Sequence, residues 1–306
     1  MITLRSVQAL GRKGDELLND RQEARFKQLN AMERLIFARM WKELSAELTE
    51  TNGRITSKKG FVALGKAIDT VFDAIEAEHL GELGRNTVSD MRAVLDFNAS
   101  YFDPFAPGKD LVSIKKSVDG AMRKRLGIDS EDGIAKRGYL DKLFRNKEPR
   151  TDVKKMVAKM VAGGRPMKEL EKALRMKVEG TKNTAGVLEK HIGGFVLDAY
   201  QVADSITNHQ FAVRLGMDKY FLYSGGLIET SRAFCRKRNN KVFTVKEAEQ
   251  WRKDPTLPRT KAEEEAGVVT DYVPIEDRGR WRCRHRIQWI TEEMAFSLRP
   301  ELRKAA

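Results

Sequence analysis

The segment from Asp15 to Thr49 contains neither proline nor glycine, and it is the feature that most constrains how this chain folds. Its apolar side chains recur at spacings of three and four: Leu29, Met32, Ile36, Met40, Leu44 and Leu48. Because an α-helix has 3.6 residues per turn, these side chains fall on one face of a helix. We therefore predict a long amphipathic helix that buries this face and ends before Asn52 and Gly53, a strong turn signal.

The rest of the first half has the same helical character. Apolar stripes indicate further helices near residues 61–75, from residue 88 toward the prolines at 104 and 107, and near residues 111–126 and 138–144. The polar segment from Arg145 to Asp152 then marks a boundary. We predict a helical N-terminal region over residues 1–149.

The second half begins with helices and ends with strands. Helices are expected near residues 153–161, 167–178 and 184–215. The stretches "KYFLYSGG" and "KVF" have the aromatic and apolar density of short strands, and Thr244 and Glu247 match the capping box of a short helix. The chain is therefore predicted to be α+β, mostly α, with a small α+β domain and a short sheet over residues 150–306.

The last expected strand is "RWRCRHRIQW", residues 280–289, which alternates between two kinds of side chain. Successive strand residues point to opposite faces of a sheet. The members of one face are Trp281, Cys283, His285, Ile287 and Trp289. The members of the other face are Arg280, Arg282, Arg284, Arg286 and Gln288. We predict a half-buried strand whose arginine face is exposed and contacts a partner.

Cys235, Cys283 and His285 form the candidate metal set. A Cys-x-His pair on one strand face can aim both side chains at one point, which suits zinc. A structural zinc site usually has four Cys or His ligands, however, and the usual paired-cysteine motif is missing here. The favoured interpretation is two buried thiols and a hydrogen-bonded histidine with no cofactor, and zinc binding is the alternative.

The charge balance favours an anionic partner. Lys and Arg number 57 against 44 Asp and Glu, which gives a formal net charge of +13. The basic run near Phe234 supplies the candidate binding residues Arg232, Arg236, Lys237 and Arg238. An aromatic side chain among basic ones suits contact with nucleic acid, and ordinary solvated surface charge is the alternative. No run approaches the roughly 18 apolar residues of a membrane span, so no membrane partner is expected.

Sequence signatures of catalysis are missing. The chain has no Gly-x-Ser-x-Gly and no His-Glu-x-x-His motif. The stretch "GFVALGKA" nearly fits a phosphate-binding loop, but Ala67 stands where that loop needs a magnesium-binding hydroxyl. We therefore expect a protein that is not an enzyme.

The order of the motifs in the second half resembles the C-terminal domain of tailed-phage minor head proteins, the phage Mu F-like or head morphogenesis family. The resemblance covers about residues 150–294. Its parts are a helix bearing Asn208 and Ala212, an aromatic strand, Ser231 and Arg232 followed by Cys235, the segment Lys241 to Thr244, and a final Cys283, Arg284 and His285. His285 stands where many members carry a second cysteine.

The resemblance implies a minor structural protein of the virion. Such a protein would be made in the host cytoplasm and lie in the head interior or at the portal vertex, in multiple copies. It would contact portal or capsid proteins, or packaged double-stranded DNA, and act in head morphogenesis, DNA packaging or genome ejection. The alternative, suggested by the positive charge and the Cys/His set, is a nucleic-acid-binding protein or a metal-dependent nucleic-acid enzyme.

Overall fold

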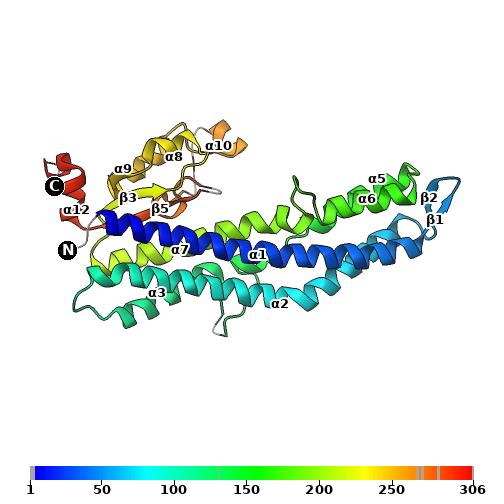
Figure 1. Ribbon diagram of the computed structural model, residues 1–306, viewed down its shortest axis with the longest axis horizontal. Coiled ribbons are helices and arrows are strands. Elements are labelled where there is room, and N and C mark those ends of the chain that lie inside the picture. Colours follow the sequence, from blue (N-terminus) through cyan, green and yellow to red (C-terminus); the bar gives the residue numbers. More distant parts are fainter. Residues whose placement is uncertain (1–3, 130, 267–268, 270–271, 281–282, 305–306) are drawn as a thin grey trace. The chain divides into compact units, whose positions relative to one another are not determined.

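The structure is a computed structural model, and it describes residues 4–129, 131–266, 269, 272–280 and 283–304 (Figure 1). It confirms the expected class, because helices dominate and the strands form two small antiparallel sheets. Two compact units are built from separate stretches of chain. Unit 1 comprises Met1–Arg21, Ser89–Leu126 and Leu197–Ala306, and unit 2 comprises Gln22–Val88 and Gly127–Val196. A division at residue 149 does not describe these units, because each draws on residues from both sides of it.

The predicted helices are present but differ in extent, and α1 begins at Leu4, well before the predicted start at Asp15. The main helices are α1 (Leu4–Glu47), α2 (Phe61–Phe102), α3 (Leu111–Leu126), α4 (Tyr139–Phe144), α5 (Glu148–Ala162), α6 (Met167–Val178) and α7 (Gly194–Leu215). The two helices expected between residues 61 and 102 are one continuous helix, α2. The helix expected from residue 184 begins instead with a π-helical turn, Glu189–Gly193, that leads into α7. Most of the polar segment expected as a boundary is the first turn of α5.

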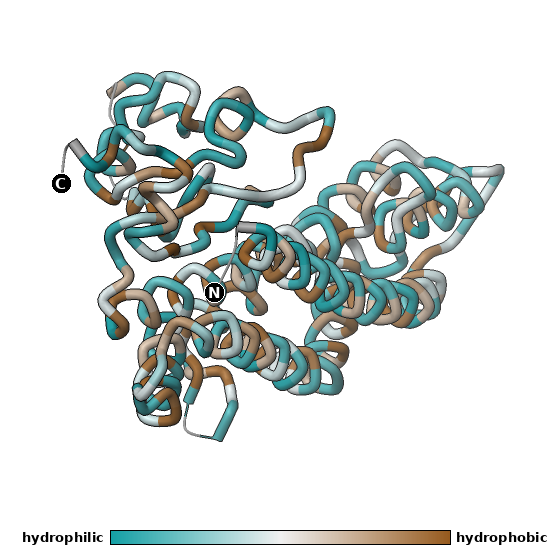
Figure 2. Tube along the Cα trace, turned by 60° about the vertical axis from the view of Figure 1, so that its left-hand side comes forward, coloured by the Kyte–Doolittle hydropathy of each residue, from teal (hydrophilic) through white to brown (hydrophobic). Residues whose placement is uncertain are grey.

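Amphipathic packing follows the predicted stripe. Along the helices, polar and apolar stretches alternate (Figure 2). Leu29, Ile36, Met40 and Leu44 of α1 are fully buried, as their spacing predicts. None of the helices in the described part of the chain combines the length and the apolarity that crossing a membrane requires.

Unit 2 contains a hairpin and a buried carboxylate. Strands β1 (Leu48–Thr51) and β2 (Arg54–Ser57) pair antiparallel around Asn52 and Gly53, which both have positive φ as a tight hairpin turn requires. Elsewhere in the unit, Glu33 of α1 is fully buried, and its Oε1 accepts backbone hydrogen bonds from Leu188 at 2.6 Å and Glu189 at 2.9 Å. The carboxylate thereby satisfies two N–H groups at the start of the π-helical turn.

Unit 1 contains the three-stranded sheet. Its order is β4 (Lys241–Thr244), β3 (Tyr220–Gly225) and β5 (His285–Ile290), all antiparallel. The capping box of Thr244 and Glu247 is confirmed at the start of α9. The short helices of the unit are η1 (Asp103–Phe105), α8 (Ala233–Arg238), α9 (Val245–Glu249), η3 (Gln250–Lys253), α10 (Lys261–Ala266), α11 (Pro274–Asp277), α12 (Glu292–Leu298) and η4 (Pro300–Lys304).

Strand β5 corrects the prediction of an exposed arginine face. All six of its residues are buried, and Arg286 and Gln288 are 3% and 2% exposed. Both side chains point at α1: the Arg286 guanidinium occupies the space that a Cβ on Gly14 would take, and Gln288 donates to the Val7 carbonyl at 3.3 Å. The alternation therefore holds, but both faces of the strand are covered.

Arg280 and Arg284 of the expected face lie outside the strand. Arg280 precedes it with a φ of +62° and forms an ion pair with Glu263 at 2.7 Å. Arg284 is exposed. Trp281 and Arg282 lie outside the described residues. The prediction of one continuous arginine surface is wrong, because Arg280 has a positive φ and pairs with Glu263, and Arg286 is buried.

Side chains cap the outer edge of β5. The carbonyl of His285 accepts a hydrogen bond from Arg278 at 3.0 Å, that of Ile287 from Asn208 at 3.0 Å, and that of Trp289 from Tyr101 at 2.7 Å. These three carbonyls belong to alternate residues. In an antiparallel pair, the carbonyls of alternate residues point away from the neighbouring strand, here β3. An edge strand presents unpaired backbone groups to which other chains can bind. In β5, the three side-chain donors occupy these carbonyl groups.

Candidate metal centre

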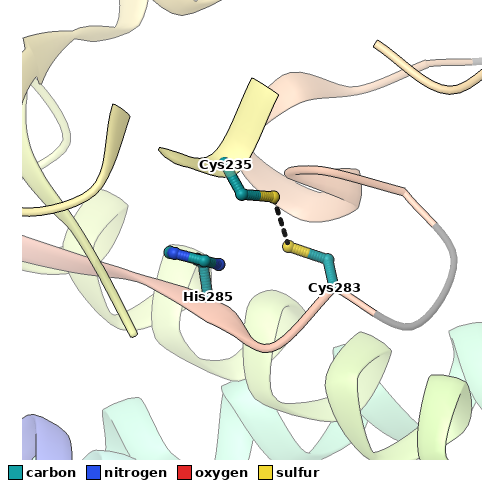
Figure 3. Close-up of side chains that lie close together, drawn as sticks. All are labelled: Cys235, Cys283 and His285. Carbon is teal, nitrogen blue, oxygen red and sulfur yellow. Dashed lines mark hydrogen bonds between the residues drawn. The ribbon is translucent and has the colours of Figure 1, made fainter. Parts of the chain in front are cut away.

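The structure brings the three candidate ligands together. Cys235 lies in α8, Cys283 lies in the segment just before β5, and His285 is the first residue of β5 (Figure 3). The two thiol groups point toward each other, with their Sγ atoms 3.9 Å apart across a sequence separation of 48 residues. The sulfur atoms and a ring nitrogen of His285 all lie within 4.8 Å of one another, and all three residues are buried.

Tyr223 of β3 contacts all three candidate ligands. Its hydroxyl lies 3.7 Å from the Cys235 sulfur and 3.5 Å from the Cys283 sulfur. Its ring stacks on the imidazole of His285 with centroids 4.9 Å apart and planes 13° from parallel. The Gly279 backbone approaches from another side, and a Cβ there would come within 2.9 Å of both sulfurs. Sulfur and imidazole are therefore held in a close-packed environment.

The pKa values of the two thiols are shifted in opposite directions. The hydrogen bond from Cys235 holds the pKa of the Cys283 thiol well below its ordinary value, and the positive charge of Arg278 acts in the same direction. The same hydrogen bond, with burial, raises the pKa of Cys235. Burial also raises the pKa of Tyr223, which stays protonated and can donate to sulfur. The arrangement favours a thiolate on Cys283, and the thiolate is the form that binds metals.

The imidazole of His285 is buried beside the thiols. The residue is 2% exposed, yet neither ring nitrogen has a hydrogen-bond partner by distance and angle among the described residues. The Cys283 thiol is nevertheless close enough for a hydrogen bond with His285 that lowers the pKa of the thiol. Leaving a buried polar group unsatisfied costs about 1–3 kcal/mol. A ligand on the imidazole would remove that cost.

A pocket of about 290 Å³ opens beside the cluster. Its described lining combines the three candidate ligands with Gly226, Ile228, Thr230, Ser231, Arg232 and Arg284. Arg232 also donates to the Gly279 carbonyl at 2.7 Å, which fixes its guanidinium beside the thiols. The described lining carries two arginines and no carboxylate, so the pocket is suited to an anion.

The basic run near Phe234 is not one surface. It forms helix α8, whose period turns Arg236 and Lys237 outward and Arg238 inward. Arg238 is 6% exposed, forms a 2.6 Å ion pair with Asp254, and lies over the Phe234 ring at 3.7 Å. Its expected role in contacting a partner is therefore wrong. Arg236 and Lys237 remain exposed candidates.

Two residues of the centre escaped the sequence analysis. Tyr223 was part of a strand motif, and Gly279 lay in a segment without a clear pattern. The alternation of β3 puts Tyr223 on the same face as Phe221, so an inward position was foreseeable. Its contact with the thiols was not, because that contact depends on the register in which β3 pairs with β5.

Comparison with known proteins gives no relative for this chain: no family model, no curated protein and no solved structure matches it.

Proposed function

We propose that this chain is a minor structural protein of a tailed-phage head, similar to the phage Mu F-like class, and that it contacts portal or capsid proteins rather than catalysing a reaction. The observation that carries the proposal is that the motif residues on which the resemblance rests contact one another in the fold. Asn208 donates to the β5 carbonyl of Ile287, and Cys235 meets Cys283 and His285 at the start of the same strand. Residues that are far apart in the motif order thus converge on one strand.

The remaining motif positions support the same framework. The segment Lys241–Thr244 pairs with β3, and Thr244 begins α9 with a capping box. Motif residues that hold structural elements together are expected of a structural domain, whereas catalytic motif residues would gather acid, base and nucleophile in a cleft. The described lining of the pocket holds no carboxylate, and its imidazole, His285, is one of the candidate metal ligands.

The exposed basic residues are the proposed partner contacts. Arg236, Lys237 and Arg284 are exposed in unit 1. An acidic surface of a portal or capsid subunit, or the phosphates of packaged DNA, would complement them. The buried Arg238 and Arg286 are not part of this surface.

Virion composition tests the proposal. Particles from the phage or prophage that encodes the chain would be purified on a density gradient and analysed by mass spectrometry. We expect its peptides to co-sediment with the major capsid protein, in fewer copies. A chain that is expressed in the infected cell but absent from full and empty heads would overturn the proposal.

A second candidate is a metal-dependent nucleic-acid enzyme, which the Cys/Cys/His cluster beside an arginine-bearing pocket favours. Cleavage of labelled DNA or RNA by the zinc-loaded chain, lost in Cys283→Ser and kept in His79→Gln, would support this candidate. Unchanged substrates with a fully loaded protein would exclude zinc-dependent cleavage.

A further inference from the structure

The distances within the cluster suit one tetrahedral metal ion. Zinc–sulfur bonds of about 2.3 Å at a tetrahedral angle place two sulfur atoms about 3.8 Å apart. The sulfurs of Cys235 and Cys283 are 3.9 Å apart. The imidazole nitrogen of His285 lies within 4.8 Å of them and needs to approach by about 1 Å, which rotation of side chains can supply.

The surroundings point to a ligand independently of these distances. His285 is a buried side chain whose ring nitrogens have no hydrogen-bond partner by distance and angle in the described structure, and it lies beside two thiols that no disulfide joins. Two thiolates and an imidazole are soft to borderline ligands that select zinc over magnesium or calcium. The Tyr223 hydroxyl lies against both sulfurs, where it can donate to a metal-bound thiolate.

The fourth coordination position of a tetrahedral ion distinguishes a closed site from an open one. A closed structural zinc site has four protein ligands, but the described residues offer a group of three. The three line the same pocket as Thr230, Arg232 and Arg284. A ligand entering there would meet two guanidinium groups, which bind oxyanions through charge-assisted hydrogen bonds.

We propose that Cys235, Cys283 and His285 bind one Zn²⁺ ion, and that the fourth coordination position opens into the pocket and takes an exchangeable oxyanion held by Arg232 and Arg284. The oxyanion is a carboxylate or a phosphate, either free or on a partner molecule. Zinc binding replaces the thiol protons and satisfies the imidazole, and it fixes α8 to the beginning of β5. The site does not depend on the proposed role in a phage head.

Metal content is the first test. The full chain, purified from zinc-supplemented cells under reducing conditions, should hold one zinc per chain by elemental mass spectrometry. His285→Gln and Cys283→Ser should each weaken zinc binding by about tenfold or more, whereas His79→Gln, a histidine in unit 2, should not. A wild-type chain that remains zinc-free after incubation with Zn²⁺, or that is isolated with a Cys235–Cys283 disulfide under these conditions, would overturn the site.

Cobalt reports ligands even where a variant folds poorly. The chelator-stripped wild-type chain titrated with Co²⁺ should develop the near-ultraviolet thiolate-to-cobalt band and the intense visible bands of tetrahedral Co²⁺. A cobalt form without a thiolate band would rule out cysteine ligation. Inorganic phosphate and acetate then probe the fourth position: each should shift the visible bands in a saturable manner.

Arg284→Gln separates the anion from the metal. The variant should keep the Co²⁺ stoichiometry and lose about three- to tenfold in phosphate affinity, because one charged hydrogen-bond donor is removed. Lys237→Gln, which removes an exposed charge of α8 outside the pocket lining, should bind phosphate as the wild type does. Visible bands insensitive to both anions would mean a closed site, and equal anion affinity in Arg284→Gln would remove that arginine from it.

Discussion

Arg286 and Asp204 form a buried two-point ion pair inside unit 1. The Nη2–Oδ1 distance is 2.6 Å and the Nε–Oδ2 distance is 3.0 Å. The Arg286 and Asp204 side chains are 4% and 2% exposed. Asn98 completes the arrangement, since it donates to Asp204 at 3.1 Å and accepts from Arg286 at 3.2 Å. The pair joins the sheet to α7 and α2, and it explains why an arginine can lie inside the protein.

Breaking this pair should strongly destabilise unit 1. We expect Arg286→Gln to lower the free energy of unfolding by about 3–5 kcal/mol, because it leaves the Asp204 carboxylate buried without its partner. The matched control is Arg284→Gln, two residues earlier and exposed, which should change stability by less than about 0.5 kcal/mol. Urea unfolding followed by tryptophan fluorescence measures both, and similar losses in the two variants would contradict the burial of Arg286.

Glu33 should make unit 2 less stable as the pH rises. Burial raises its pKa from 4.5 to about 7, against the opposing effect of the backbone hydrogen bonds from Glu189 and Leu188. Between these values the folded chain holds a proton that the unfolded chain has released. The contribution to stability is therefore fully present below pH 4.5 and is lost as pH rises through 7, by at most about 1.4 kcal/mol per pH unit.

The variant Glu33→Gln tests this dependence, because an amide does not titrate. Relative to the wild type, it should become progressively more stable between pH 5 and 8 in urea unfolding. Glu23→Gln, a substitution of an exposed α1 glutamate paired with Lys27, should not. A wild-type minus Glu33→Gln difference that is flat over this range would contradict a raised pKa at Glu33.

Any side chain at position 186, where the chain has Gly186, should lower the free energy of unfolding. A Cβ at this position would lie 2.2 Å from a Glu33 carboxylate oxygen, and the hydrogen bonds from Leu188 and Glu189 hold that carboxylate in place. We expect Gly186→Ala to cost about 1–3 kcal/mol through overpacking. Gly65→Ala, in the helix α2 with open space around it, should instead stabilise by about 0.5–1 kcal/mol. Thermal unfolding of both variants would reveal the opposite signs, and equal signs would argue against the contact.

Tyr101 should matter through its hydroxyl. That group donates to the Trp289 carbonyl on the outer edge of β5 and is buried. Tyr101→Phe keeps the ring and leaves the carbonyl unsatisfied, so we expect a loss of about 1–3 kcal/mol and faster amide hydrogen exchange in β5. Ser100→Ala, an exposed neighbour on α2, is the control. Unchanged exchange in β5 would show that the edge does not depend on this bond.

Sequence periodicity alone determined most of the secondary structure. The spacing of apolar residues located α1, α3 and α6, the aromatic density located β3, and the capping box of Thr244 located α9. These features depend on contacts between residues a few positions apart, which a sequence displays directly. The same spacing also identified the buried face of α1.

Local periodicity predicted the continuity of helices and the burial of charged residues less well. It divided α2 into two helices, because the apolar stripe weakens between Ile75 and Val88, while the backbone continues unbroken. It also treated the basic run as surface, because charged residues are usually exposed. Arg238 is nevertheless buried by α8, where Asp254 and the Phe234 ring compensate its charge.

Only the tertiary structure decided which groups meet. The alternation of the last strand separated Cys283 and His285 from Arg286 correctly, but it carried no information on what covers each face. Asp204 lies 82 positions from Arg286, and Cys235 lies 48 positions from Cys283. A buried charge requires a specific distant neighbour that compensates it. Chain topology and strand register, rather than local sequence, bring that neighbour into place.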